Sequence, residues 1–490
     1  MNGREAAATS QEAAAISEEA SDGAPPPVVA VANRLPVQQG PDGWELSPGG
    51  LVTALRPVMA RGSGSWVGWD GGTADMPEQL PNMRLKLHRV SLSPDELAGY
   101  YHGFSNRTLW PLLHNALEKP VFEREWWRTY RSVNETFARA AVAALTAQPD
   151  ALLWVHDYHL MLVPQLVRDS KPEQLIGYFL HVPWPAPDLY VRLPWRADVL
   201  RGLLGADVVS FHTERYRRNF VQSCARVLDI DGVSVKGTDI VLASGRVVRT
   251  ASSPISIDVG EFTTLANSAE TRAEIANLEE QFSGRTVLLG VDRLDYTKGI
   301  VERLLALEVL LERREDLRSG LVFVQVAVPS RDDVQEYRDL RATVEQIVGR
   351  INGRFTQPGQ DVPVHYLYRS LPPPRLAAYY ATADALLVTP LMDGMNLVAK
   401  EYVVVQQALR RDGVLILSEF TGAALELRNA TLCNPFDVEG LASKIEQALA
   451  QPAPARRASV NAMARRVRKH DVHEWVQQQL AAIQGTPRPV

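Results

Sequence analysis

One loop of this 490-residue chain places two cations directly after an apolar run that is typical of a buried strand. The run RTVLLG is followed by VDRLDYTKG (291–299), which supplies Arg293 and Lys298. A surface ion pair with Asp292 or Asp295 is the alternative role for Arg293. An arginine offers a planar fork and a lysine a compact point charge, so the two cations together could neutralise a diphosphate.

A second loop of the same kind follows the apolar run ALLVTP. It reads DGMNLVAKE (393–401) and carries Asp393 and Glu401, and the residues from Asn396 onward predict the first turn of a helix. The free N–H groups and the dipole of a helix N-terminus favour an anion. An ordinary strand-loop-helix link is the alternative for either loop alone. Neither loop has Walker or dinucleotide-fingerprint spacing, so the pair predicts a nucleotide diphosphate other than NAD.

These loops and several further runs closely resemble the trehalose-6-phosphate synthase family, whose members are retaining nucleotide-sugar glucosyltransferases with two Rossmann-like domains. The resemblance extends from about Val28 to about Trp475, in the family's order and spacing. It implies that glucose passes from a nucleoside-diphosphate glucose, with UDP-glucose favoured, to glucose 6-phosphate. The product would be α,α-trehalose 6-phosphate, formed with retention of configuration. The further runs are NRLPV (33–37), SPGGL (47–51), VHDYHL (155–160), FLHVPWP (179–185) and PSRDDVQEY (329–337).

The resemblance assigns the donor site to residues from both halves of the chain. It places Asp393 on hydroxyls of the donor glucose, Glu401 on the ribose, and His181 beside the glucose near the reacting carbon. A core histidine is the alternative for His181, and a generic turn is the alternative for the glycines at 49–50. The expected donor-binding residues are Gly49, Gly50, His181, Arg293, Lys298, Leu371, Asp393, Asn396, Leu397, Val398 and Glu401.

The phosphate dianion of the acceptor requires cations of its own. Arg34 follows the first predicted strand and Arg331 follows VFVQVAVPS, so two guanidinium forks could close on one phosphate. By resemblance Tyr101 joins them and Asp157 binds acceptor hydroxyls, whereas Trp69 could equally be a core residue. The expected acceptor-binding residues are Arg34, Trp69, Tyr101, Trp110 as the acceptor wall, Asp157 and Arg331.

The expected chemistry rests on electrostatics. No two carboxylates stand out as the nucleophile and acid of a retaining hydrolase. The resemblance implies retention without a covalent enzyme intermediate, with the leaving phosphate taking the acceptor's proton. Because cations neutralise the phosphates and no DxD stands at a strand end, we expect no metal and no cofactor. The expected catalytic residues are Asp157, His181, Arg293, Lys298 and Asp393.

Two alternative functions remain open at this stage. The first is a transferase of the same fold that uses another acceptor, a cyclitol pseudo-sugar, or ADP-glucose or GDP-glucose, because base preference depends on contacts around Tyr368 and Leu371. The second is a catalytically silent homologue that binds sugar phosphates and regulates a partner. A silent homologue is expected to lack charged residues of the site, whereas all of those named above are present, so an enzyme is favoured.

Composition bounds the class of protein. Hydrophobic residues make up 46% and charged residues 22%, which is typical of a globular protein. The formal net charge is -5, so the chain as a whole has no positive electrostatic field that would attract nucleic acid. The two cysteines, Cys224 and Cys433, lie far apart in sequence and suit a reducing compartment. No apolar stretch reaches the length of a membrane span, so we expect a cytoplasmic protein with small-molecule substrates. A homotetramer is expected by resemblance alone.

Alternation of apolar runs with amphipathic segments predicts an α/β fold with two facing, doubly wound parallel-sheet domains of the GT-B type and the active site between them. Residues 1–27, rich in Ala, Glu and Ser and ending in prolines, are expected to be a disordered tail. We expect an acceptor domain at 28–255, a donor domain at 256–454, and a C-terminal helix at 455–490 that returns to the first domain. The predicted strands are 28–33, 65–69, 151–156, 174–182, 206–212, 285–291, 321–328, 364–368, 385–390, 413–418 and 430–434.

One run suggests a different enzyme. VLDIDGVS (227–234) looks like the acidic nucleophile motif of a sugar phosphatase. It lies inside the first expected domain, after a run typical of a helix, and leaves no room for a phosphatase core. We therefore interpret it as a turn with two surface acids, so that the product leaves still phosphorylated.

Overall fold

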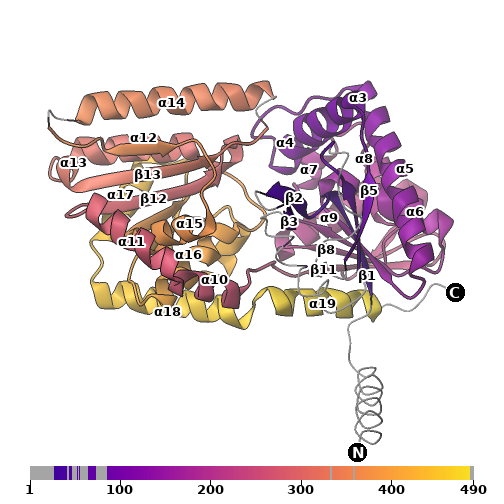
Figure 1. Ribbon diagram of the computed structural model, residues 1–490. Helices are drawn as coiled ribbons and strands as arrows, with labels where there is room; N and C mark the ends of the chain where they lie inside the picture. Colours follow the sequence, from indigo (N-terminus) through magenta and orange to yellow (C-terminus); the bar gives the residue numbers. More distant parts are fainter. Residues whose placement is uncertain are drawn as a thin grey trace, which may run out of the picture.

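The computed structural model describes residues 27–40, 43–46, 52, 55, 64–72, 85–331, 334–356 and 359–485. Two α/β domains lie side by side, each built around its own sheet (Figure 1). The predicted fold class is therefore confirmed. Residues 1–26 of the tail expected at 1–27, and the glycines Gly49 and Gly50, lie outside the described residues.

The first domain contains a nine-stranded sheet in the order β5-β4-β1-β6-β7-β8-β11-β10-β9. The pairs from β5 to β11 are parallel, and β10 pairs antiparallel with both of its neighbours. Its central strands are continuous apolar runs because helices cover both faces of a parallel sheet. The strands are β1 (Val28–Arg34), β4 (Ser65–Trp69), β5 (Lys86–Val90), β6 (Leu152–His156), β7 (Ile176–Leu180), β8 (Val208–Phe211), β9 (Ser234–Lys236), β10 (Asp239–Val241) and β11 (Val247–Ser252). A separate hairpin joins β2 (Val37–Gly40) to β3 (Gly43–Leu46).

Helices of the first domain present apolar stripes to this sheet. In α5 (Arg124–Ala147) the buried positions include Tyr130, Val133, Phe137 and Ala141, which recur at helical spacing. Beside α5 lies η2 (Leu97–Leu109), a π-helix that carries Tyr100 and Tyr101. The first domain also contains α6 (Val163–Ser170), α8 (Arg196–Leu203) and α9 (Glu214–Val227).

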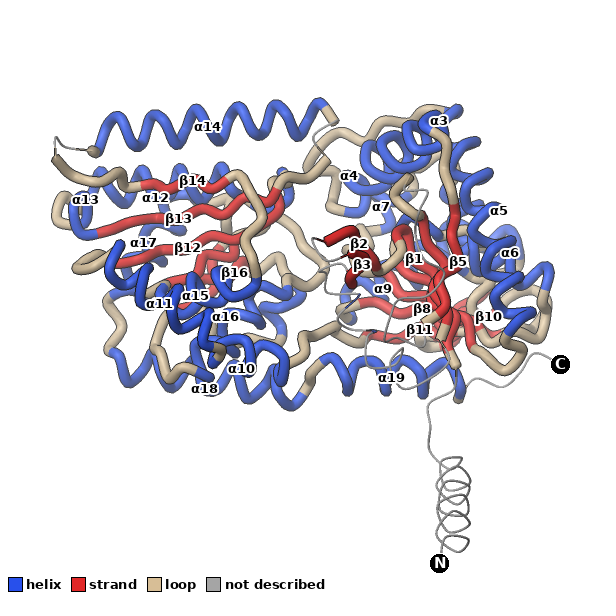
Figure 2. Tube along the Cα trace, viewed as in Figure 1, coloured by secondary structure: helices blue, strands red, loops and turns tan. Residues whose placement is uncertain are grey.

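The second domain contains a six-stranded parallel sheet in the order β14-β13-β12-β15-β16-β17 (Figure 2). Its strands are β12 (Thr286–Arg293), β13 (Leu321–Val328), β14 (Val364–Leu367), β15 (Ala385–Val388), β16 (Val414–Ser418) and β17 (Thr431–Cys433). One face packs on α12 (Ile300–Arg313), α14 (Gln335–Phe355) and α17 (Val438–Leu449). The other packs on α10 (Val259–Asn267), α11 (Ala269–Gln281), α15 (Pro373–Thr382) and α16 (Leu397–Ala408). Strand order reverses in both domains, and ligands of such sheets bind at the carboxyl ends of the strands.

The chain crosses between the domains twice, and the two crossings lie together. The first crossing runs from β11 to α10, and the predicted boundary at 255/256 falls inside it. The side-chain ammonium of Lys400 donates to the carbonyl of Ile255 at 2.8 Å, and the indole of Trp475 donates to the carbonyl of Ser253 at 3.2 Å. These bonds tie the first crossing to both α16 and the C-terminal segment.

The expected C-terminal helix is two helices, α18 (Ala453–Lys469) and α19 (Val472–Gln484). Asp471 ends the continuity because its side chain caps α19 by accepting the backbone N–H of Glu474 at 3.0 Å. Helix α18 packs on α16, whereas α19 packs on β7. The ring of Trp475, on α19, lies 5.3 Å from that of Trp154 and 5.0 Å from that of Phe179, both of which belong to the first domain. The C-terminal segment therefore spans both domains (Figure 1).

Every strand predicted from an apolar run is present, with ends shifted by a few residues. Strands β5 and β9 to β11 and the hairpin β2–β3 were not predicted. They are short or lie near a sheet edge, so fewer of their side chains are buried: β9 is exposed throughout. The run at 227–234 forms a 3-10 turn, Asp229–Asp231, whose Asp231 pairs with Arg201 on the surface, as expected.

Two further features concern the whole chain. Both cysteines are free and buried. Within the part of the chain that the structure describes, no helix is long and apolar enough to cross a membrane.

Candidate active site

The loop after β12 forms a tight turn that presents Lys298 to the second loop. Asp295 caps a 3-10 turn, η5 (Tyr296–Lys298), by accepting the backbone N–H of Thr297 at 3.0 Å. Gly299 follows with φ +63°, and a Cβ there would lie 2.1 Å from the carbonyl oxygen of Thr389. Only glycine fits this close approach, which fixes where α12 begins.

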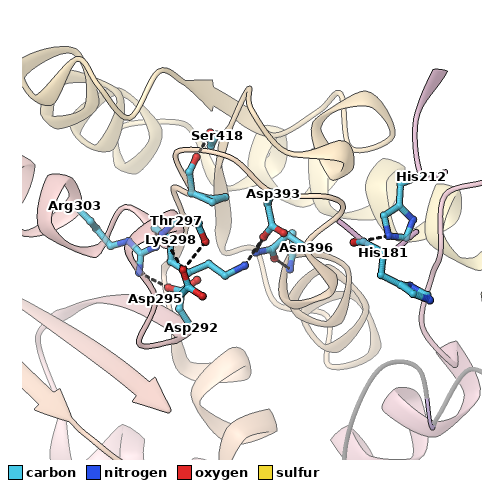
Figure 3. A network of polar contacts seen from close by, with 12 residues as sticks. His181, His212, Asp292, Asp295, Thr297, Lys298, Arg303, Asp393, Asn396 and Ser418 are labelled. Carbon is cyan, nitrogen blue, oxygen red and sulfur yellow. Dashed lines mark hydrogen bonds and ion pairs between the residues drawn. The ribbon is translucent and has the colours of Figure 1, made fainter. Parts of the chain in front are cut away.

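The loop after β15 holds a carboxylate between two donors. The ammonium of Lys298 lies 2.7 Å from Oδ2 of Asp393, and the side-chain amide of Asn396 donates to the same oxygen at 3.2 Å (Figure 3). Asn396 is also the N-cap of α16, with φ +78°, and its side-chain oxygen accepts the N–H of Ala399 at 3.2 Å. Burial raises the pKa of Asp393, but Lys298 outweighs it and the pKa lies below its usual value. Asp393 is thus ionised and held in one orientation by these two donors.

This second loop also touches the first domain. The hydroxyl of Tyr216, on α9, donates to the carbonyl of Asp393 at 2.9 Å. A Cβ on Gly394 would lie 2.4 Å from the carbonyl oxygen of His181, which follows β7. That carbonyl accepts from Nε2 of His212 at 3.1 Å (Figure 3). The backbone of the loop after β15 therefore lies against His181, the residue that we expected beside the donor glucose.

Buried ion pairs leave Arg293 available. Asp292 pairs with Arg303 at 2.7 Å and Asp295 pairs with Arg331 at 3.2 Å, so neither acid holds Arg293 in the surface ion pair that was its alternative role. Among the described residues Arg293 forms no ion pair, and it is exposed. Its guanidinium lies 5.6 Å from the ring centroid of Trp110.

Arg331 is the most enclosed of the expected cations. Its side chain is 4% exposed, and its backbone has φ +54°. Its guanidinium donates to the hydroxyl of Tyr158 in the first domain at 3.1 Å and lies 4.0 Å from the ring centroid of Trp110. Because Tyr158 and Trp110 belong to the first domain, Arg331 already joins the two halves of the site.

Arg34 lines a pocket of about 190 Å³. Its guanidinium lies 4.7 Å from the ring centroid of Trp69 and 5.9 Å from that of Tyr101. Burial raises the pKa of the Tyr101 hydroxyl, but the charges of Arg331, Arg34 and Arg293 together bring that pKa below its ordinary value. Residues from both domains therefore make one cationic region. The pocket is lined by Ala32, Asn33, Arg34, Leu35, Val52, Trp66, His156, Asp157 and His159.

Asp157 and His181 lie side by side at the ends of β6 and β7. Asp157 has φ +73°, and its Oδ1 accepts the backbone N–H of His181 at 3.3 Å. Burial raises the pKa of Asp157 to about 6. Burial lowers the pKa of His181 well below its usual value, so its ring is neutral and lies 3.2 Å from Nδ1 of His156. The histidine thus has a polar partner at the end of β6.

Glu401 faces inward from α16. It accepts the hydroxyl of Tyr380 at 2.8 Å, and burial raises the pKa of Glu401 to about 7. Leu371 lines a pocket of about 520 Å³, and it packs against the same hydrophobic cluster as Leu397 and Val398. Leu397 and Val398, in the first turn of α16, are half-buried.

The structure thus brings most of the expected residues to the facing strand ends, and it adds partners that sequence reasoning missed. These are Tyr158, Tyr216, His212, Asp295, Tyr337 and Tyr380. Several lie inside quoted motifs, but a motif does not show which side chain faces a ligand and which supports a neighbour. Gly394 carried a signal, since a glycine beside an acid is typical of close backbone approach. Of the described residues, no group of three His, Cys, Asp or Glu side chains could hold a metal ion.

Two facing parallel-sheet domains, with cations and carboxylates at their opposed strand ends, define a glycosyltransferase of the GT-B type. Glycosyltransferase family 20 matches residues 27–485. The chain belongs to this family.

Trehalose-6-phosphate synthases are among the proteins that this chain resembles. The trehalose-6-phosphate synthase of Mycobacterium tuberculosis is 46% identical over 477 residues, which cover 93% of this chain and 94% of that protein. Among solved structures, trehalose-6-phosphate from E. coli bound with UDP-2-fluoro glucose has a TM-score of 0.84 at 32% identity, covering 94% of this chain and 100% of that one. An α,α-trehalose-phosphate synthase (UDP-forming) from Burkholderia xenovorans in complex with glucose-6-phosphate has a TM-score of 0.84 at 33% identity, with coverage of 94% and 100%.

Proposed function

We propose that this chain transfers glucose from UDP-glucose to glucose 6-phosphate, giving α,α-trehalose 6-phosphate and UDP with retention of configuration. The observation that carries the proposal is a cationic region between the two domains. It is formed by Arg34, Arg293 and Arg331, whose charges together lower the pKa of the Tyr101 hydroxyl. Two phosphorylated substrates that react with each other need two adjacent anion sites. The ligands of the E. coli and Burkholderia relatives are a donor analogue and this acceptor, which favours the same pair here.

On the donor side, Arg293 and Lys298 would neutralise the diphosphate as it departs. Lys298 holds Asp393 in the structure, and an ammonium has three donors, so it can keep that contact while reaching a phosphate oxygen. Asp393 would accept hydroxyls of the donor glucose, and Glu401 would bind the ribose. The N-terminus of α16 adds free backbone N–H groups near the phosphates.

On the acceptor side, Arg34 and Arg331 would grip the phosphate, and Asp157 would accept hydroxyls of the sugar. In the chemical step the anomeric oxygen of the acceptor bonds to C1 of the donor glucose while the bond from C1 to the β-phosphate oxygen breaks. The proton of the attacking hydroxyl passes to the departing phosphate oxygen, so no protein base is consumed. Attack and departure on the same face account for retention.

The proposed reaction needs no metal, because fixed cations supply the charge that a divalent ion supplies to other diphosphate leaving groups. Treating the protein with a chelator and then removing it should leave turnover unchanged. Turnover that falls and returns with added Mg²⁺ would contradict this part of the proposal.

Initial rates with UDP-, ADP- and GDP-glucose against glucose 6-phosphate, glucose and a cyclitol phosphate test the function. We expect UDP-glucose and glucose 6-phosphate to give the highest kcat/KM, and NMR of the product to show both anomeric centres in the α configuration. A different best donor or acceptor would favour the same-fold alternative. No turnover with any pair, together with tight binding of sugar phosphate, would favour a regulatory homologue.

A further inference from the structure

Asp295 connects the loop after β12, which carries Lys298, to the arginine proposed for the acceptor phosphate. Its side chain is fully buried, and each of its oxygens serves a different element. Oδ1 accepts the backbone N–H of Thr297 at 3.0 Å and the hydroxyl of Thr297 at 2.9 Å. Oδ2 accepts the hydroxyl of Tyr337 at 3.1 Å and the guanidinium of Arg331 at 3.2 Å. One carboxylate thus holds both the turn that carries Lys298 and the fork of Arg331.

Arg331 depends on such support. Its positive φ is uncommon for a residue with a side chain, and its guanidinium reaches the first domain, where it meets Tyr158 and the face of Trp110. A buried guanidinium can present its remaining N–H groups to a ligand only if its other contacts fix the plane of the fork. Asp295 and Tyr337 occupy one nitrogen and Tyr158 occupies another.

Charge favours the same role. Burial raises the pKa of Asp295, but Arg331, Arg293 and Lys298 outweigh it and bring the pKa to about 2. The carboxylate is therefore ionised at neutral pH, and all of its strong acceptor positions are used within the protein. It has nothing left to offer a substrate.

We propose that Asp295 is a positioning residue that fixes the guanidinium of Arg331 for the acceptor phosphate while it shapes the donor turn. The proposal rests on the proposed function, because it takes glucose 6-phosphate as the ligand of Arg331. Asp295 acts on binding through Arg331 and does not touch the reacting atoms. Removing the Asp295 carboxylate should therefore weaken binding of glucose 6-phosphate only when Arg331 is present.

A double-mutant cycle tests this dependence. In Asp295→Asn the side-chain oxygen can still accept from Thr297, while the amide nitrogen replaces the acceptor that faces Arg331. We expect the KM for glucose 6-phosphate to rise about tenfold, the scale of one lost charge-assisted hydrogen bond, with little change in the KM for UDP-glucose. Arg331→Ala should raise the acceptor KM further. Adding Asp295→Asn to Arg331→Ala should then change it by less than about twofold.

The control is Asp207→Asn, which removes another buried carboxylate that pairs with an arginine, Arg168, at 2.7 Å but lies outside the site. It should lower the melting temperature and leave both KM values unchanged. If Asp295→Asn does not fold, Tyr337→Phe, which removes a hydroxyl that contacts both Asp295 and Arg331, should raise the acceptor KM in the same direction by a smaller factor.

Two outcomes would overturn the inference: effects of Asp295→Asn and Arg331→Ala that multiply, or an acceptor KM that neither Asp295→Asn nor Tyr337→Phe changes. Failure of the proposed function would be distinct. In that case the wild type itself would show no preference for glucose 6-phosphate over glucose, whatever the cycle gives.

Discussion

At the scale of single residues, the charged side chains of the site differ in whether an ion pair within the protein already neutralises them. Asp292 and Asp295 each hold a buried arginine, and Asp393 holds Lys298. Arg293 is exposed at the end of β12 and has no ion-pair partner in the described ranges. A cation without a fixed partner can give its whole charge to a ligand, so Arg293 is the residue whose loss should affect turnover most and stability least.

Arg293→Ala should lower kcat about a hundredfold or more, because charge stabilisation that grows in the transition state is removed. Arg293→Lys should recover only part of this, since a point charge does not reproduce the fork. Initial rates and a melting curve measure both effects. Arg128→Ala, an exposed arginine on α5 that pairs only with Glu125, is the control and should change neither. Wild-type turnover in Arg293→Ala would contradict the diphosphate assignment.

Asp157 gives a prediction about pH. Its folded pKa of about 6 exceeds its ordinary 3.8, so the folded protein binds this proton more tightly than the unfolded chain does. The stability gained from the proton is complete below about pH 4 and is lost as the pH rises through about 6. At neutral pH, Asp157→Asn should therefore raise the free energy of unfolding, on the order of 2 kcal/mol.

The same variant should lose turnover, because an amide is a weaker acceptor of sugar hydroxyls than a carboxylate. Melting temperatures across this pH range measure the stability effect, and the advantage of Asp157→Asn should shrink toward the acid end. A variant less stable than the wild type at neutral pH would show that the ionised carboxylate is stabilising where it stands.

At the scale of elements, the loops that follow β12 and β15 work as a pair because backbone contacts fix them. The N–H of Leu391 donates to the carbonyl of Thr297 at 2.7 Å, which joins the two loops directly. Gly394 then brings the second loop against His181, with no space for a side chain. Close packing of backbone on backbone transmits small displacements to the site.

Gly394→Ala should reduce kcat/KM on the order of a hundredfold. The added methyl group must push the loop after β15 away from the first domain, and this displacement would misplace the reacting groups. The control is Gly349→Ala on α14, where a Cβ meets nothing within 4 Å. That change should raise stability by about 1 kcal/mol and leave the rate unchanged. An alanine at 394 with wild-type kcat/KM would show that the loop adapts without cost.

At the scale of the whole molecule, a few polar contacts join the domains at the site. Besides Tyr216 and Tyr158, Arg107 on η2 pairs with Glu336 on α14 at 3.0 Å. The larger attachment lies on the opposite side, where α19 and the first crossing bury Trp475. The domains are therefore joined by buried aromatic packing at the crossings and by a few polar contacts at the site.

This asymmetry predicts closure by ligands. Substrates that contact Arg34 and Asp157 on one domain and Arg293 and Asp393 on the other favour the state in which both sets are near. Small-angle scattering with UDP and glucose 6-phosphate together should show a smaller radius of gyration than the free protein. The variant Arg107→Ala should be more open without ligand. An unchanged profile at saturating ligand, with turnover intact, would show that the site is preformed.

The sequence by itself determined the parallel sheets, the positions of their central strands along the chain and the loops that carry Arg293, Lys298 and Asp393. These features depend on apolar runs and turn residues that are local in the chain. It missed the edge strands, because exposed strands lack an apolar run. It also did not show that Asp295 holds Arg331, or that Gly394 lies against the carbonyl of His181. Those relations join residues tens to hundreds of positions apart, and only the packing of the two domains decides which of them meet.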